Sequence, residues 1–211
     1  MDVNPAQVVI GFTVLLFSLT VHEAAHAWSA WRLGDPTARD QGRVSLNPLV
    51  HIDLVGTVIF PLLAMVANAP VLGWAKPVPV DLRRLRHWRR DHMVIAAAGP
   101  VSNLALALAA AVVLRLLPVS SGAEGFNLVQ PLTAMCESAV FINVILAVFN
   151  LVPVPPLDGG NVVRGLMHGR LAAGFDRLRP YGFVLLYGLM FTGVLSSLIG
   201  PPARVLVGWL L

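Results

Sequence analysis

The sequence predicts an all-α polytopic membrane protein with about five to six membrane-embedded helices and a short β-hairpin or re-entrant segment. Hydrophobic residues make up 56% of the 211 positions and charged residues 12%, about half of the roughly 25% charged residues in an ordinary soluble domain. Apolar stretches close to the roughly 20 residues that a membrane-spanning helix needs recur along the chain. The net charge of +4 comes from arginines beside these stretches, a pattern typical of membrane proteins. The composition therefore excludes a disordered chain and a nucleic-acid-binding domain.

Five apolar segments are expected to span or enter the bilayer. They cover about residues 8–31, 54–72, 93–117, 132–152 and 181–199, and a short apolar tail, 205–211, follows Pro201 and Pro202. The second segment is short and is interrupted by Gly56, Pro61 and Pro70. No linker or internal repeat separates the segments, so residues 1–211 are expected to form a single transmembrane domain. The one cysteine, Cys136, allows no internal disulfide.

The sharpest local signal is the sequence His22-Glu23-Ala24-Ala25-His26 at the end of the first apolar segment. Residues four apart lie on one face of a helix, so both imidazoles can bind a single metal ion. Glu23 lies one position along, where it can act as a base rather than join the two ligands. Six histidines and three glutamates in this chain would produce the pattern by chance in roughly one of 400 such chains. Three ionisable residues on an apolar helix therefore indicate a functional site.

Asp158 is the best candidate for a third metal ligand, because a catalytic zinc usually has three protein ligands and one water. It follows Pro153, Pro155 and Pro156, which cannot continue the preceding helix. Non-helical backbone at membrane depth is tolerated where it lines a cavity enclosed by protein. The alternative is that Asp158 only caps the helix that follows.

Three motifs, taken together, resemble the site-2 protease family of intramembrane zinc metalloproteases. They are the His22–His26 motif, Gly99-Pro100-Val101-Ser102-Asn103, and the segment from Asn150 to Gly160. Residues 33–36, 47–48, 51–53 and 73–80 resemble the short prokaryotic members that have no PDZ or CBS domain. The resemblance implies that His22, His26 and Asp158 hold one Zn²⁺ per chain and that Glu23 is the catalytic base. It also implies that Asn150 helps to hold the substrate or the developing oxyanion.

The topology follows from the need for His22 and Asp158 to share a metal ion. An even number of crossings must separate them, and the third and fourth segments supply two. Residues 54–72 should therefore dip into the membrane and return, or pack as a hairpin with residues 73–80 near the active site. All Lys and Arg residues except Arg115 and Arg204 then lie on one side, 13 of 15. This asymmetry predicts a multi-pass protein of the cell membrane whose active site opens toward the cytoplasm.

The expected partners are a transmembrane protein substrate and the lipid bilayer, without nucleic acid, and homo-oligomer formation is left open. Asn103 and Asn143 are expected to bond across helices, with support of the metal site as the alternative. His51 is expected to be a structural histidine, with contact to a metal ligand as the alternative. Two other functions remain open: a multi-pass metal transporter, and a non-catalytic binder of transmembrane partners.

Overall fold

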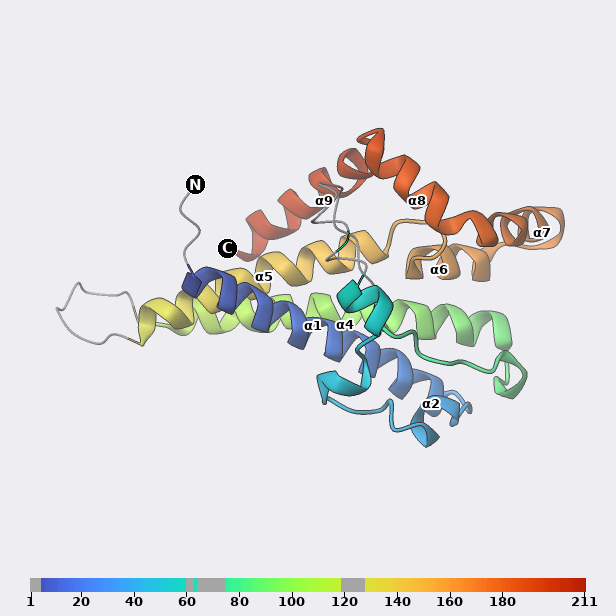
Figure 1. Ribbon diagram of the computed structural model, residues 1–211, viewed down its shortest axis with the longest axis horizontal. Helices are drawn as coiled ribbons and strands as arrows, with labels where there is room; N and C mark the ends of the chain where they lie inside the picture. Colours follow the sequence, from blue (N-terminus) through green and yellow to red (C-terminus); the bar gives the residue numbers. More distant parts are fainter. Residues whose placement is uncertain (1–4, 60–62, 64–74, 119–127) are drawn as a thin grey trace.

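The computed structural model describes residues 5–59, 63, 75–118 and 128–211, and all regular structure in these residues is helical (Figure 1). The predicted all-α class is thus confirmed. The predicted β-hairpin is not present in the part of the chain that the structure describes, where residues 75–81 are irregular. Gly73, Trp74 and most of segment 54–72 lie outside the described residues.

Three helices are long and apolar enough to cross a membrane: α1 (Pro5–Arg32), α4 (Trp88–Leu116) and α5 (Val129–Asn150). They correspond to the first, third and fourth predicted segments. Four short helices lie in the described residues between α1 and α4: α2 (Thr37–Asp40), η1 (Pro48–Val50), η2 (Leu54–Ile59) and η3 (Leu82–Arg84).

Helix α4 is the centre of the fold, because it packs against α1, α5 and α6 (Asp158–Leu166). Ala107 and Ala111 lie one turn apart on α4 and contact Val140 and Val144 of α5, and all four are completely buried. Small side chains at such an interface let two helices approach closely, which lipid-embedded helices need because apolar burial alone does not drive their association.

The C-terminal part differs from the predicted single span at 181–199 followed by a separate tail. Helices α7 (Gly169–Leu178), η4 (Arg179–Tyr181) and α8 (Gly182–Phe191) form one run, which meets α9 (Val194–Leu210) at an angle of 75°. The bend lies at Gly193, whose φ of +76° is a left-handed conformation that glycine adopts without steric cost. The described residues therefore contain three candidate spans, or four if the bent pair is one span.

The prediction that Pro201 and Pro202 separate two segments is also wrong, since both lie inside α9. A proline removes one helical hydrogen bond and normally ends or kinks a helix. Here Ala203 is buried against α5, and Leu206, Val207 and Leu210 pack around the same cluster. This packing holds α9 helical through the two prolines, an effect that the local sequence does not reveal.

The chain between α1 and α4 returns to the end of the bundle from which it leaves. Arg32 at the end of α1 and Arg86 and Arg90 at the start of α4 line one pocket of about 410 Å³. A single full crossing by residues 54–72 would place these arginines at opposite ends. The geometry therefore agrees with the predicted even number of crossings.

Candidate metal centre

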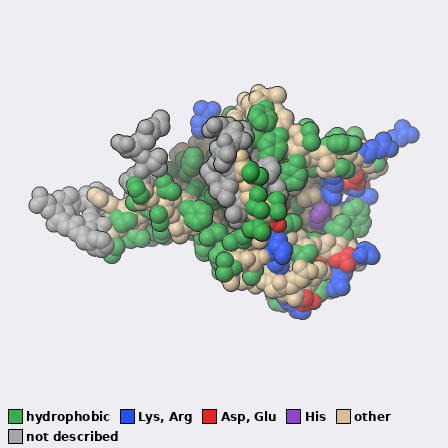
Figure 2. All heavy atoms as spheres, in the orientation of Figure 1, with side chains coloured by type: hydrophobic (Ala, Val, Ile, Leu, Met, Phe, Trp, Pro, Cys, Tyr) green, Lys and Arg blue, Asp and Glu red, His purple; other side chains and the backbone are tan. Residues whose placement is uncertain are grey.

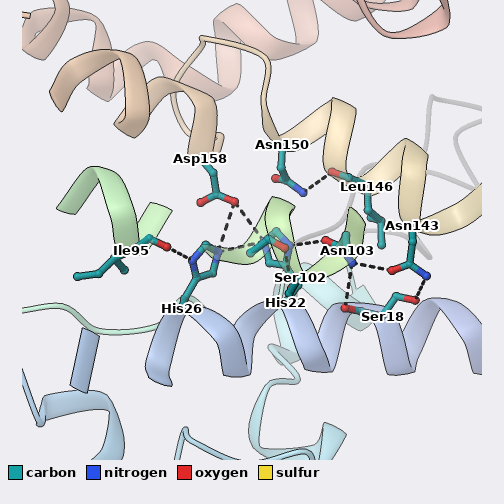
Figure 3. Close-up of polar contacts among 11 residues, drawn as sticks. Ser18, His22, His26, Ile95, Ser102, Asn103, Asn143, Leu146, Asn150 and Asp158 are labelled. Carbon is teal, nitrogen blue, oxygen red and sulfur yellow. Dashed lines mark hydrogen bonds and ion pairs between the residues drawn. The ribbon is translucent and has the colours of Figure 1, made fainter. Parts of the chain in front are cut away.

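His22, His26 and Asp158 converge where α1, α4 and the start of α6 meet (Figure 3). The Nε2 atoms of His22 and His26 are 3.0 Å apart. The Asp158 Oδ2 atom lies 3.1 Å from Nε2 of His22 and 3.3 Å from Nε2 of His26. Both histidines are buried, with 4% and 8% of their surface exposed. The structure thus brings together the three predicted metal ligands.

The other ring nitrogen of each histidine is bonded to a fixed acceptor. His22 Nδ1 lies 2.6 Å from Oδ1 of Asn103, and His26 Nδ1 lies 2.7 Å from the carbonyl oxygen of Ile95. Because these oxygens can only accept, both Nδ1 atoms carry the proton in a neutral ring. The Nε2 lone pairs are then directed at the cluster, as is usual for histidines that bind a metal ion.

The orientation of the Asn103 amide is set by a buried polar network across three helices (Figure 3). Its Nδ2 atom donates to the Ser18 carbonyl on α1 and to Oδ1 of Asn143 on α5. Asn143 in turn donates to Oγ of Ser18 and to the Ala139 carbonyl. Since a backbone carbonyl cannot donate, Oδ1 of Asn103 must face His22. Asn103 therefore combines both expected roles, bonding across helices and orienting a candidate ligand, while Asn143 only supports it.

Three ligand atoms this close together fit a tetrahedral zinc ion. Two imidazole lone pairs and a carboxylate repel each other unless a proton or a cation lies between them. Two histidines and one carboxylate are a common ligand set of catalytic zinc.

Gly99 on α4 provides the space for the two imidazoles. A Cβ atom at this position would lie 2.4 Å from Nε2 of His26 and 2.6 Å from Nε2 of His22. Pro100, which follows, removes one bond of the α4 ladder, next to the turn in which the Ile95 carbonyl binds His26. The spacing His-x-x-x-His does not reveal this close approach, although Gly99 lies in a motif that the sequence analysis noted.

The start of α6 places Asp158, and two glycines allow it to approach. A Cβ at Gly159 would lie 2.2 Å from the Leu151 carbonyl oxygen, and one at Gly160 would lie 2.9 Å from the Pro155 nitrogen. Asp158 is the first residue of α6, and no side-chain hydrogen bond caps this helix. The alternative that Asp158 only caps a helix is therefore wrong, because its carboxylate contacts the histidines instead.

The two predicted catalytic residues lie on α1 and α5. Glu23 is half-buried on α1 and interacts electrostatically with His26 and Arg43. Asn150 is the last residue of α5, and its Nδ2 atom donates to the Leu146 carbonyl at 3.0 Å (Figure 3). That bond uses one of the two amide hydrogens, which leaves the other for a further acceptor.

His51 lies outside the metal cluster, as expected of a structural histidine. It is buried, its Nε2 atom lies 2.9 Å from the Ser45 carbonyl oxygen, and its own carbonyl accepts from the Lys76 N–H. These contacts hold residues 45–51 and residue 76 together.

Comparison with known proteins relates the chain to metalloproteases. The family model described as peptidase family M50 matches residues 126–187. The chain is 35% identical to "Putative zinc metalloprotease YwhC" of Bacillus subtilis, over 89% of this chain and 82% of the relative. It is 28% identical to "Putative zinc metalloprotease Rip2" of Mycolicibacterium smegmatis, over 86% of this chain and 66% of the relative. It is also 29% identical to "Putative zinc metalloprotease Rip3" of Mycobacterium tuberculosis, of which it spans 43%. No solved structure matches the chain.

Proposed function

Because the chain belongs to peptidase family M50, the site-2 protease family of membrane zinc metalloproteases, we propose that it hydrolyses peptide bonds within or near transmembrane segments of membrane protein substrates. One observation carries the proposal: the Nε2 atoms of His22 and His26 and the Oδ2 atom of Asp158 converge inside a bundle of apolar helices. We propose these three residues as the ligands of one zinc ion per chain. Alanine at any one of these three positions should weaken zinc retention. Full zinc occupancy in Asp158→Ala would exclude Asp158 as a ligand.

The proposed chemistry assigns the proton transfers to Glu23. When bound, zinc polarises the scissile carbonyl and lowers the pKa of its water to about 7 in well-studied sites. Glu23 accepts a proton from the attacking water and passes it to the leaving amine. Its electrostatic interaction with His26 supports this role, and its carboxylate is not among the three converging atoms. Asn150 is proposed to hold the substrate or the developing oxyanion with its remaining amide hydrogen.

A substrate helix must unwind before it is cut, because its carbonyls are engaged in helical hydrogen bonds. The unwound stretch then needs new backbone partners inside the membrane. We propose that residues 75–80 provide them by strand addition. The Lys76 N–H already donates to the His51 carbonyl, and Pro77 and Pro79 have no N–H. The donors that remain for a substrate are therefore those of Ala75, Val78 and Val80.

The proposed orientation places the metal centre on the cytoplasmic side of the cell membrane. Figure 2 shows a group of Lys and Arg side chains at the end of the molecule that holds α6 and α7. Arg32, Arg86 and Arg90 lie at this end as well. The excess of positive charge in cytoplasmic loops supports this orientation. Within one domain of about five to six membrane-embedded segments, residues 54–72 would then re-enter rather than cross.

The decisive test is the variant Glu23→Gln, which removes the base and keeps the size of the side chain. It should retain zinc and still bind a transmembrane substrate, while cleavage falls about 10²–10⁴-fold. A metal transporter would keep most of its ion flux in this variant, and a non-catalytic binder would show no cleavage in the wild type. Normal processing of a co-expressed substrate by Glu23→Gln would contradict the proposal.

A further inference from the structure

A buried arginine anchors one end of the irregular segment 75–81. Arg43 is 3% exposed, and its Nη2 atom donates to the carbonyl oxygens of Lys76 and Pro77 at 2.5 and 3.0 Å. Its Nη1 atom donates to the Val50 carbonyl. Together with the bond from the Lys76 N–H to the His51 carbonyl, these contacts attach the start of the segment to residues 50 and 51.

A buried aspartate anchors the other end. Asp35 is completely buried, and its Oδ2 atom accepts from the Asp81 N–H at 2.7 Å. Its Oδ1 atom accepts from the N–H and the hydroxyl of Thr37, and its own N–H donates to the Ala30 carbonyl in the last turns of α1. The segment is therefore tied at residue 81 to the end of the helix that carries His22 and His26.

Both anchors are charged side chains, and burying a charge costs free energy. Neither Asp35 nor Arg43 forms an ion pair within the described residues, and the buried Nε atom of Arg43 has no hydrogen-bond partner. A buried charge without an ion-pair partner is costly, so packing alone would favour apolar side chains at these positions. Among the described residues, the guanidinium donates to the carbonyls of Val50, Lys76 and Pro77. The arginine thus bonds to two successive residues of the segment.

The anchored segment packs against the two helices, α1 and α4, that surround the candidate metal centre. Val80 packs against Ala30, Leu85 and Ile95, and the carbonyl of Ile95 holds Nδ1 of His26. Between the anchors, the N–H groups of Val78 and Val80 have no hydrogen-bond partner among the described residues. The segment therefore presents unpaired backbone donors next to the part of α4 that holds His26.

We propose that Asp35 and Arg43 are positioning residues that hold segment 75–81 at its two ends and keep the Val78 and Val80 N–H groups unpaired for the backbone of an unwound substrate. This inference rests on the proposed proteolytic function, and it identifies residues that act through the segment rather than on the reacting atoms. Asp35 sets the geometry of binding and not the chemistry, so its loss should raise KM and leave kcat nearly unchanged. Arg43 also interacts electrostatically with Glu23, so the variant Arg43→Lys, which keeps the positive charge, is used to compare kcat at that position.

The test uses the full chain in nanodiscs and a synthetic transmembrane peptide with a central Gly-Pro pair. In the Glu23→Gln background the peptide should protect the Val78 and Val80 amides from hydrogen exchange. Adding Arg43→Gln or Asp35→Asn should remove this protection and weaken peptide binding at least tenfold at unchanged zinc content. In the active enzyme Asp35→Asn should raise KM about tenfold, with kcat within about twofold. Arg43→Gln should raise KM to a similar extent.

Arg39→Gln is the matched control, because Arg39 lies near Arg43 in sequence and forms an exposed ion pair with Asp40. It makes the same change of charge and should leave peptide binding and KM unchanged. Arg43→Lys keeps the charge but cannot reproduce the planar guanidinium contacts, so it should give an intermediate KM. Arg43→Lys also serves as the test variant for this position if Arg43→Gln does not fold.

The outcomes separate the inference from the proposed function. Peptide binding without protection of Val78 and Val80, or an unchanged KM in the Arg43 variants, would overturn the inference while leaving a zinc protease. If the zinc-loaded wild type cleaved no membrane substrate, the proteolytic function would fail. Protection of the two amides by the bound peptide, lost in Arg43→Gln, would still support the positioning role in that case.

Discussion

The close approach of α4 to the imidazoles predicts that Gly99→Ala abolishes tight zinc binding. The added Cβ would lie 2.4 Å from Nε2 of His26, 2.5 Å from Cε1 of His22 and 2.6 Å from Nε2 of His22. Non-bonded carbon contacts are roughly 3.5–4.0 Å, so the rings or α4 must move by about 1 Å. The rings have little freedom, because Asn103 and the Ile95 carbonyl hold both Nδ1 atoms. Metal–ligand distances tolerate only about 0.2 Å.

We therefore expect zinc affinity to fall at least 100-fold in Gly99→Ala, equivalent to about 2.8 kcal/mol. The affinity is measured by competition with a chromogenic chelator, and the thermal unfolding of the zinc-free protein shows whether the variant folds. Gly11→Ala is the matched control, because Gly11 is also on a membrane helix and a Cβ there would meet no atom within 4 Å. Wild-type zinc affinity in Gly99→Ala would show that the imidazoles are not confined by α4, and the reasoning would fail.

Three further predictions follow from the same geometry. Asn103→Ala removes the acceptor of His22 Nδ1, so zinc affinity should fall about 10–100-fold in the chelator competition. An unchanged zinc affinity would show that Asn103 does not orient His22. Gly159→Ala would place a Cβ 2.2 Å from the carbonyl oxygen of Leu151 and should displace Asp158. The zinc content measured by mass spectrometry should therefore drop, and full zinc occupancy would contradict the tight contact. In a chain without Cys136, a membrane-impermeant thiol reagent applied from outside should label a cysteine at Glu124 and spare one at Arg86; the reverse labelling would refute the cytoplasmic orientation.

Much of the candidate site was predictable because its chemistry is local in the sequence. The spacing of His22 and His26 places two imidazoles on one helical face, whatever surrounds that helix. The prolines before Asp158 require the chain to leave the preceding helix, which frees Asp158 to join a site outside that helix. The three long helices were predictable for a similar reason, since the length and hydropathy of a span are properties of a continuous stretch.

The break at Gly193 and the continuation of α9 through Pro201 and Pro202 were not predictable in this way. A glycine in an apolar run is compatible with a straight helix or with a turn, and two prolines usually end a helix. The contacts of Ala203 and its neighbours with α5 decide the outcome. These contacts join residues that are far apart in the chain, so no local pattern contains them.

The sequence by itself thus determined the class of protein, the three long helices and the residue types of the candidate metal centre. Only the tertiary structure decided how these ligands are held: Asn103 against His22, the Ile95 carbonyl against His26, and Gly99 beneath both rings. It also decided that Asp35 and Arg43 hold the two ends of segment 75–81. The physical reason is that ligand identity depends on side-chain chemistry at a fixed spacing. Ligand orientation depends on hydrogen bonds and close contacts between helices, which exist only after those helices pack.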